Sequence, residues 1–333
     1  MPHALRCFAT IVAYFMLTVA MCVHMAKANG NSLDVKIPHG TNQFYYQQRD
    51  EKFITYDAWE LPGTRHRILR GPSVSPTDIE KGHYFTTIGA AETFGCFAQK
   101  PYPTLVSAHI GLPCLNFGRG GAGPAYFNNP DNDDIIELAN HGLFVVISVM
   151  SSRQASNTLF SSKQGGYTVD YKGLIMTADA AWKSIVDENW GSNKQDIGKL
   201  IEESRDSYVR EYHALFRKIK VPILLFYFSR RQPDYTINWA TNHVSSLSGD
   251  AFPQFVDQST INRILEAKPT HYATCVSKRG WPQPLYLKSD TLHKKLPIRT
   301  NRYYPSPEMH EDAAGILYPI CQSITNQMRS SLK

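Results

Sequence analysis

Apolar and amphipathic segments alternate along the chain from about residue 83 onward. Apolar runs bounded by turn-forming residues predict strands at 83–89, 113–118, 143–150, 221–229 and 271–276. Helical periodicity falls between these runs, at 104–111, 131–141, 178–186, 197–219, 260–267 and 308–328. Repeated strand–helix alternation predicts an α/β fold with three α/β/α layers and a mainly parallel, five-stranded, flavodoxin-like sheet. Ligands of such sheets bind beyond the carboxyl ends of the strands.

The amino terminus has the pattern of a targeting segment. Arg6 precedes an apolar run, Phe8–Val23, and the small-x-small sequence Ala26–Ala28 follows it. Residues 1–28 therefore predict a cleaved signal peptide, an uncleaved membrane anchor or an incorrect start codon, and the sequence leaves these open. A genuine signal would make the protein periplasmic or secreted, and otherwise we expect it in the cytoplasm. Contact with a membrane is expected only through this segment, if it is uncleaved.

Two further regions complete the predicted organisation. Residues 29–82 are polar, aromatic and rich in turn formers, which predicts an N-terminal arm that covers the next domain. Residues 83–330 form the predicted α/β domain, with a helical insertion around 165–219.

Composition excludes some classes of function. The chain has 333 residues, of which 42% are hydrophobic, and 35 basic against 29 acidic residues. A net charge of +6, dispersed along the sequence, gives no reason to expect nucleic-acid binding. No Walker-type loop or metal-ligand spacing occurs, so we expect no cofactor and no metal. Beyond the first segment there are four cysteines, which allow three disulfide pairings or buried free thiols: Cys96, Cys114, Cys275 and Cys321.

The stretch Tyr84–Gly95, YFTTIGAAETFG, indicates a strand, a tight turn and a helix start. α/β enzymes place a nucleophile at such a turn. The sequence from Gly89 resembles the first block of the SGNH/GDSL hydrolase superfamily, Gly-Asp-Ser-x-Thr-x-Gly, but Ala91 stands at the position of the nucleophilic serine. Thr93 is then a weak alternative nucleophile, and Glu92 a candidate base or a helix-start carboxylate.

Other blocks of the superfamily are matched in part. Asn116 and Gly118, in NFGRGGAGP, resemble the second block, which implies oxyanion donors, and the alternative is a close glycine-rich turn. His310 occupies the histidine position of the fifth block, but the aspartate position is a proline. Glu308 is one of the carboxylates able to replace that aspartate, and His310 is the candidate acid or base.

The loop after the third predicted strand, MSSRQASN, lacks the third-block motif. Ser151, Arg153 and Asn157 are candidate donors there, although a serine at this point is also suited to capping a helix. Arginines follow three strands, as Arg119, Arg153 and Arg230, and their convergence would form an anion site unless they face solvent.

Several phrases over residues 40–325 also resemble an uncharacterised bacterial family of unknown function: LRGP, GAAETFG, NFGRGGAGP, VMSSR and YYPSPEMH. The resemblances imply an SGNH-like enzyme that carries out hydrolysis or transfer on a small glycan-like or anionic substrate without the usual serine. Two alternatives remain: a catalytically inactive protein that binds a sugar or anion, and a sulfuryl- or phosphoryl-type transferase.

Overall fold

The computed structural model describes residues 48–331 apart from short gaps, at 63, 65–66, 163–164, 167, 190–193, 236–251 and 290–296. The predicted signal peptide or anchor (1–28) and the first part of the predicted arm (29–47) lie outside the described residues. No helix in the described part has the length and apolarity needed to cross a bilayer.

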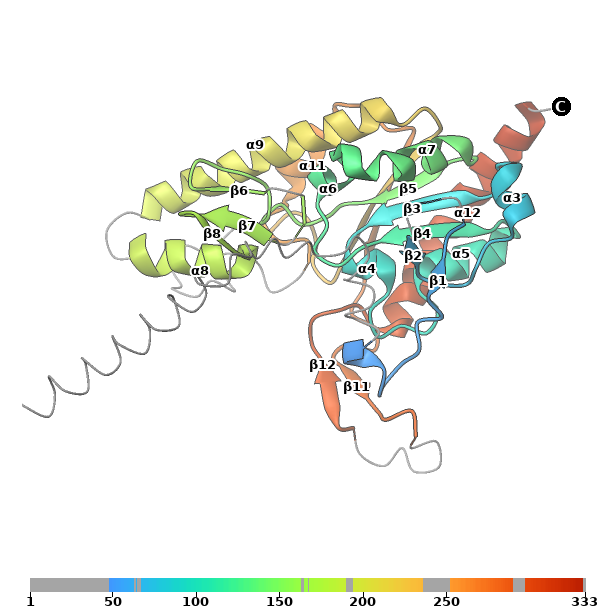
Figure 1. Cartoon of the computed structure of the whole chain (residues 1–333), viewed down its shortest axis with the longest axis horizontal. Coiled ribbons are helices and arrows are strands. Elements are labelled where there is room, and N and C mark those ends of the chain that lie inside the picture. Colours follow the sequence, from blue (N-terminus) through green and yellow to red (C-terminus); the bar gives the residue numbers. More distant parts are fainter. Residues whose placement is uncertain are drawn as a thin grey trace, which may run out of the picture. The chain divides into compact units, whose positions relative to one another are not determined.

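A five-stranded parallel sheet forms the centre of the domain (Figure 1). Its spatial order is β10-β9-β5-β3-β4, and every neighbouring pair is parallel. The strands are β3 (Phe85–Gly89), β4 (Cys114–Gly118), β5 (Val145–Ser148), β9 (Ile223–Ser229) and β10 (His271–Val276). Numbered along the chain, this is the flavodoxin-like order 2-1-3-4-5, so the predicted fold class is confirmed.

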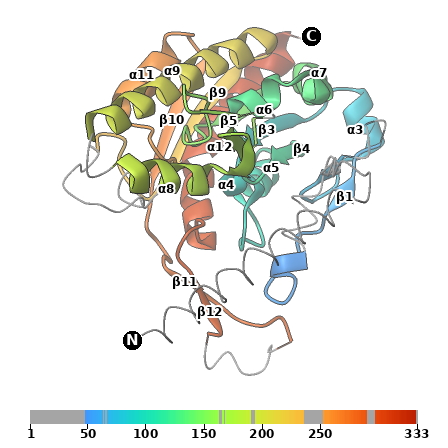
Figure 2. The same cartoon turned by 60° about the vertical axis from the view of Figure 1, so that its left-hand side comes forward.

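Helices cover both faces of this sheet (Figures 1 and 2). One face packs against α5 (Tyr102–Ile110) and the long α12 (Pro307–Ser331). The other face carries α6 (Pro124–Asn128), α7 (Asp133–His141), α9 (Lys194–Lys218) and α11 (Gln258–Leu265), with a short 3-10 turn, Pro130–Asn132, before α7. This is the three-layer arrangement that strand–helix alternation predicts.

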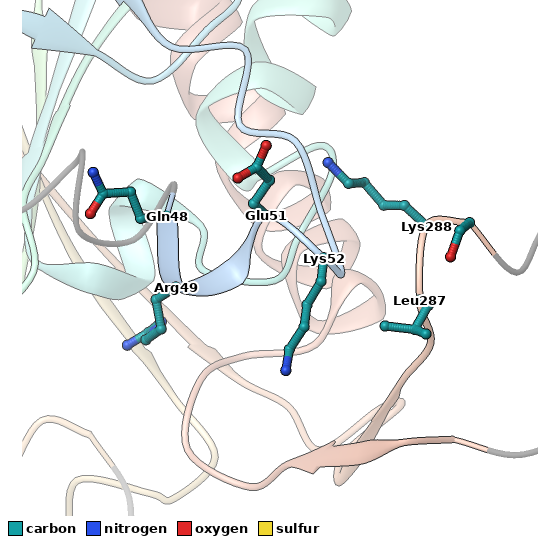
Figure 3. A pocket seen from close by; sticks show the side chains of 7 residues that line it. Gln48, Arg49, Glu51, Lys52, Leu287 and Lys288 are labelled. Carbon is teal, nitrogen blue, oxygen red and sulfur yellow. The ribbon is translucent and has the colours of Figure 1, made fainter.

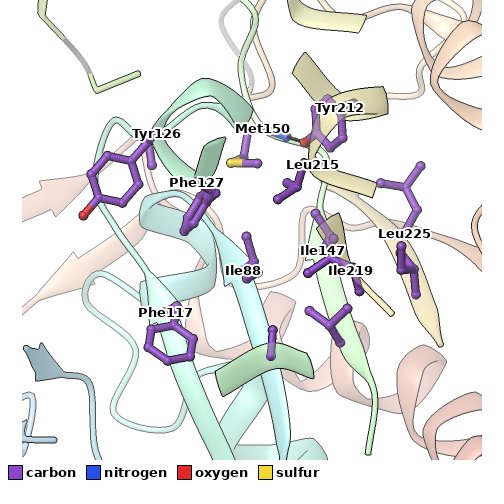
Figure 4. Close-up of a cluster of buried hydrophobic side chains, with 14 of the residues drawn as sticks. Ile88, Phe117, Tyr126, Phe127, Ile147, Met150, Tyr212, Leu215, Ile219 and Leu225 are labelled. Atoms are coloured by element: carbon purple, nitrogen blue, oxygen red, sulfur yellow. Dashed lines mark hydrogen bonds between the residues drawn. The ribbon is translucent and has the colours of Figure 1, made fainter. Parts of the chain in front are cut away.

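The two cores explain why the central strand β9 is apolar at nearly every position. In β9, Leu225 and Tyr227 join the core beneath α9, part of which is drawn in Figure 4. Their neighbours Leu224, Phe226 and Phe228 point to the other core, beneath α12. A strand that is covered on both faces needs apolar residues at every position rather than at alternate ones.

A small antiparallel sheet precedes the helices of the predicted helical insertion. It contains β6 (Phe160–Ser161), β7 (Thr168–Tyr171) and β8 (Leu174–Thr177), and α8 (Ala178–Asn189) follows it. The prediction of helical structure from residue 165 is therefore wrong for the hairpin, although α8 and α9 lie where helices were predicted. The hairpin turns through Lys172 and Gly173, both with positive φ, as a two-residue β-turn requires.

The described part of the predicted arm lies against α4 (Ala91–Phe94), the one-turn helix after β3. Tyr56 packs its ring at 4.9 Å from that of Phe94, and its hydroxyl accepts a hydrogen bond from Phe97 N at 3.1 Å. The remaining short elements are β1 (Trp59–Glu60), β2 (Ile68–Leu69), α3 (Pro76–Glu80), β11 (Gln283–Leu285) and β12 (Arg299–Asn301). Leu285 of β11 belongs to the same cluster as Tyr56.

Candidate active site

A small cleft opens at the carboxyl edge of the sheet. It has a volume of about 30 Å³, which suits a small substituent rather than a whole sugar ring. Its lining comes from the segments that follow β3, β4 and β5, from Phe252 shortly before α11 and from the segment before α12: Ala90, Ala91, Glu92, Gly121, Ala122, Ser151, Arg153, Gln154, Phe252, Tyr303, Tyr304 and Pro305. The order of the sheet reverses between β3 and β5, and doubly wound proteins bind ligands at that point.

Close packing of α4 against the sheet depends on two glycines. A Cβ on Gly118 would lie 2.2 Å from the backbone nitrogen of Phe94, and a Cβ on Gly89 would lie 2.0 Å from Thr93 Oγ1. Both contacts are too short for any side chain. Gly89 and Gly118 therefore fix where α4 begins, and through it the position of Ala91 and Glu92 in the cleft.

Glu92 supplies the carboxyl group of the cleft. The residue is only 2% exposed, and its Oε1 accepts a hydrogen bond from the backbone N–H of Ala90 at 3.1 Å. Burial raises the pKa of Glu92 to about 8, against the opposing effect of its hydrogen bonds. A carboxyl group with this pKa can both take up and release a proton near neutral pH.

Arg153 supplies the cation of the cleft lining. Its Nη1 pairs with Asp179 Oδ1 at 2.6 Å, at the start of α8, and its Nη2 donates to Tyr303 Oη at 3.1 Å. Although burial disfavours the charged form, Tyr303 and Asp179 raise the pKa of Arg153. The guanidinium is therefore charged and already has a carboxylate partner.

Two other predicted donors of this loop differ in position. Ser151 lines the cleft, and its hydroxyl donates to the carbonyl oxygen of Gln254 at 3.4 Å. Asn157 lies outside the cleft and donates to Ser204 Oγ at 3.1 Å. No serine of this loop caps a helix, because the next element is the strand β6.

Thr93 points away from the cleft into the interior. Its hydroxyl lies 2.7 Å from Ser148 Oγ and 3.1 Å from Tyr102 Oη, and the last two atoms are 2.9 Å apart. These three buried hydroxyls form a closed ring of hydrogen bonds beneath α4. The hydroxyl of Thr93 forms its hydrogen bonds within this ring. The structure therefore does not support the prediction that Thr93 acts as a nucleophile.

Asn116 is also used within the fold. Its Nδ2 donates to the Thr93 carbonyl at 3.0 Å, and its Oδ1 accepts from the Gly118 N–H at 2.8 Å. Neither Asn116 nor Gly118 lines the cleft. The predicted oxyanion donors therefore bind one another and α4, which agrees with the alternative of a close glycine-rich turn.

His310, in the first turn of α12, points into the interior and does not line the cleft. It is fully buried, stacks on the ring of Tyr102, and its Nδ1 accepts the Tyr102 backbone N–H at 3.2 Å. Burial, and the charge of Arg70 to a smaller degree, lower the pKa of His310 to about 3, so the imidazole is neutral. Glu308 lies against Gly280, outside the cleft lining. His310 therefore does not line the cleft with the loops after β3 and β5, because the first turn of α12 directs it inward.

The predicted arginines do not gather in one place. The guanidinium of Arg119 lies 4.7 Å from the ring centre of Tyr126, and that of Arg230 lies 3.9 Å from Trp281. Of the three, Arg153 alone belongs to the cleft lining. The predicted anion site therefore lacks its set of converging cations.

Tyr303 and Gln254 are contributors that the sequence analysis missed. Gln254 Nε2 donates to Tyr303 Oη at 3.3 Å, next to the bond from Arg153. In the sequence, the position of Tyr303 within the YYPSPEMH phrase was the signal that could have pointed to it. Tyr303 lies 150 positions from its partner Arg153.

A wider cleft lies elsewhere, between the start of the described chain and residues 287–289 (Figure 3). Its volume is about 570 Å³, but the side chains of Arg49 and Glu51 point in opposite directions (Figure 3). Arg49 is paired with the buried Asp50 at 2.6 Å. This cleft contains none of the predicted site residues.

The described part of the chain contains neither a candidate metal site nor a disulfide. No group of three or more His, Cys, Asp or Glu residues gathers there as a metal site. The four cysteines beyond the first segment are buried free thiols, which was one of the two alternatives predicted from the sequence: Cys96, Cys114, Cys275 and Cys321.

Comparison with known proteins gives a family match and distant structural neighbours. Residues 44–164 match the family described as "Domain of unknown function (DUF6473)". No curated protein matches the chain.

Three solved structures are similar to this chain in part. A carbohydrate esterase family 2 enzyme with a carbohydrate-binding domain, from Corynascus thermopiles (Myceliophthora fergusii), is 12% identical, with 79% of this chain and 71% of that chain covered and a TM-score of 0.31. A candidate SGNH hydrolase from Slackia heliotrinireducens is 14% identical (71% and 97% covered, TM-score 0.32). An acetyl xylan esterase from the rumen bacterium Butyrivibrio proteoclasticus is 11% identical (79% and 67% covered, TM-score 0.34). Likenesses this distant assign neither a reaction nor a substrate to this chain.

Proposed function

We propose that the protein is an SGNH-like enzyme that hydrolyses or transfers a small substituent of a glycan-like substrate, with Glu92 as general acid and base. One observation carries the proposal: a carboxyl group that is only 2% exposed, with its pKa raised to about 8, lines a cleft at the reversal point of the sheet. Perturbed carboxyl groups in such clefts are typical of catalytic sites.

The charges of the cleft favour a neutral, hydroxyl-rich substrate over an anion. Arg153 is neutralised by Asp179, and Arg119 and Arg230 lie elsewhere. Tyr303, 41% exposed, offers an aromatic surface beside the cleft on which a sugar ring can lie. The small volume admits one substituent of that ring, such as an ester or hydroxyl group.

The reaction proceeds without a covalent intermediate at Ala91, because a methyl group cannot attack. Water or an acceptor hydroxyl forms a bond to the electrophilic carbon of the substituent and gives its proton to the ionised Glu92 carboxylate. The bond between that carbon and the sugar oxygen then breaks, and the sugar oxygen takes the proton from Glu92. The carboxylate is regenerated, so protons and electrons balance over the cycle.

Two variants test this function. Purified protein is incubated with O-acylated oligosaccharides, with and without acceptor sugars, and products are followed by mass spectrometry. Glu92→Gln should reduce turnover at least 100-fold, in the range that general acid–base catalysis contributes, while Glu137→Gln, an exposed carboxylate on α7, should leave it unchanged. Binding of the sugars without turnover by the wild-type protein would favour the catalytically inactive binding protein instead.

A further inference from the structure

The hydroxyl group of Tyr303 has two hydrogen-bond neighbours, and both are donors. Arg153 Nη2 lies at 3.1 Å, and Gln254 Nε2 lies at 3.3 Å. A guanidinium has no acceptor atom, and the amide nitrogen of glutamine is likewise a donor only. With the Gln254 amide in this orientation both lone pairs of the phenolic oxygen are occupied, and the hydroxyl proton points in another direction.

Tyr303 lines the cleft and is 41% exposed, so its hydroxyl proton is available to a group that enters. The neighbouring guanidinium is held in place by Asp179 and withdraws electron density from the phenolic oxygen. A donor polarised in this way binds a negatively charged oxygen more strongly than a neutral one.

The donors expected from the sequence are not available for this task. Asn116 and Gly118 bind each other and α4, and the Ala90 N–H donates to Glu92. The hydroxyl of Ser151 donates to the backbone carbonyl of Gln254. Tyr303 lines the cleft and keeps a hydroxyl proton that can be donated to a substrate oxygen.

We propose that Tyr303 is a catalytic residue that donates a hydrogen bond to the oxygen on which negative charge develops during the reaction, with Arg153 and Gln254 as its positioning residues. This inference rests on the proposed function of the cleft. It assigns the stabilisation of charge to a phenol from the loop before α12, rather than to the loops after β3 and β4. No proton leaves Tyr303, because it acts by hydrogen bonding alone.

Turnover of the O-acylated oligosaccharides by Tyr303→Phe tests the proposal. The change removes one oxygen atom and keeps the ring, so we expect kcat to fall roughly 100-fold or more, with KM and the melting temperature nearly unchanged. Tyr318→Phe, which changes a tyrosine of similar exposure (40%) on α12, is the matched control and should keep full turnover.

A second variant tests the direction of the hydroxyl proton. In Gln254→Glu a carboxylate replaces the amide donor and accepts the Tyr303 proton, so kcat should fall as in Tyr303→Phe. In Gln254→Met the proton stays free, and a loss of less than about tenfold is expected if the residue only positions Tyr303.

The outcomes separate the inference from the proposed function. Turnover that is abolished by Glu92→Gln and kept by Tyr303→Phe, or a change in KM alone, would overturn the role of Tyr303 and leave Glu92 in place. Full turnover by Glu92→Gln, or none by the wild-type protein, would overturn the proposed function and this inference with it.

Discussion

Glu92→Gln should change how the stability of the protein depends on pH. Glutamine has nearly the shape of the protonated glutamic acid but cannot ionise. In the native protein burial raises the pKa of Glu92 from 4.5 to about 8, and unfolding returns it to its ordinary value. Between these two values the native state binds a proton that the unfolded state has lost, so the stability due to the protonated carboxyl falls as pH rises.

The size of the effect follows from the two pKa values. Each pKa unit corresponds to about 1.4 kcal/mol, so a rise from 4.5 to about 8 corresponds to roughly 5 kcal/mol. This stability is fully present below pH 4.5 and is lost by the time the pH exceeds 8. The variant has no such loss, so its free energy of unfolding relative to wild type should increase by up to roughly 5 kcal/mol over this range.

Urea unfolding from pH 4 to pH 9 measures this difference. Other titrating groups, such as His310, are present in both proteins, so their contributions cancel when the two curves are subtracted. Glu137→Gln, the same change at an exposed carboxylate on α7, provides the control. Parallel curves for Glu92→Gln and wild type would show that Glu92 ionises in the folded protein as it does in water, and would refute the reasoning.

Three further predictions concern the support of the site. Gly118→Ala should lower the free energy of unfolding by about 1–3 kcal/mol or more, because its Cβ would lie 2.2 Å from the α4 backbone. The control Gly315→Ala, which places a Cβ in open space on α12, should raise the free energy of unfolding by about 0.5–1 kcal/mol. Equal effects of the two variants in urea unfolding would count against the close approach of Gly118 to α4. Tyr102→Phe removes one member of the hydroxyl ring and should cost about 1–3 kcal/mol in the same assay, whereas an unchanged midpoint would mean that the ring adds nothing. His310→Gln should make the protein more resistant to acid between pH 6.5 and about 3, where the unfolded state binds a proton that the native imidazole does not; the same acid transition as wild type would contradict this.

The order of strands and helices could be predicted because the sheet is covered on both faces. The continuous apolar run Ile223–Ser229 is buried at every position, and this strand lies within the predicted range 221–229. The β7–β8 hairpin was missed because its strands are short and its turn, Lys172–Gly173, lacks the usual Asn-Gly signal.

The site was predictable only in part, since sequence gives the position of a residue on an element and not the direction of its side chain. Glu92 and Arg153 follow β3 and β5 and do reach the cleft. Asn116 and His310 occupy equally suggestive positions, but their side chains satisfy backbone groups inside the fold. Tyr303 reaches the cleft through contacts across 150 residues, which no local pattern encodes.

A crystal structure of the protein with a short neutral oligosaccharide bearing one ester group tests the central claim most directly. We predict that the ester group occupies the cleft between β3 and β5, within hydrogen-bond distance of both the Glu92 carboxyl and the Tyr303 hydroxyl. An oligosaccharide bound only in the wide cleft beside residues 287–289, or one that leaves the Glu92 carboxyl untouched, would contradict the assignment.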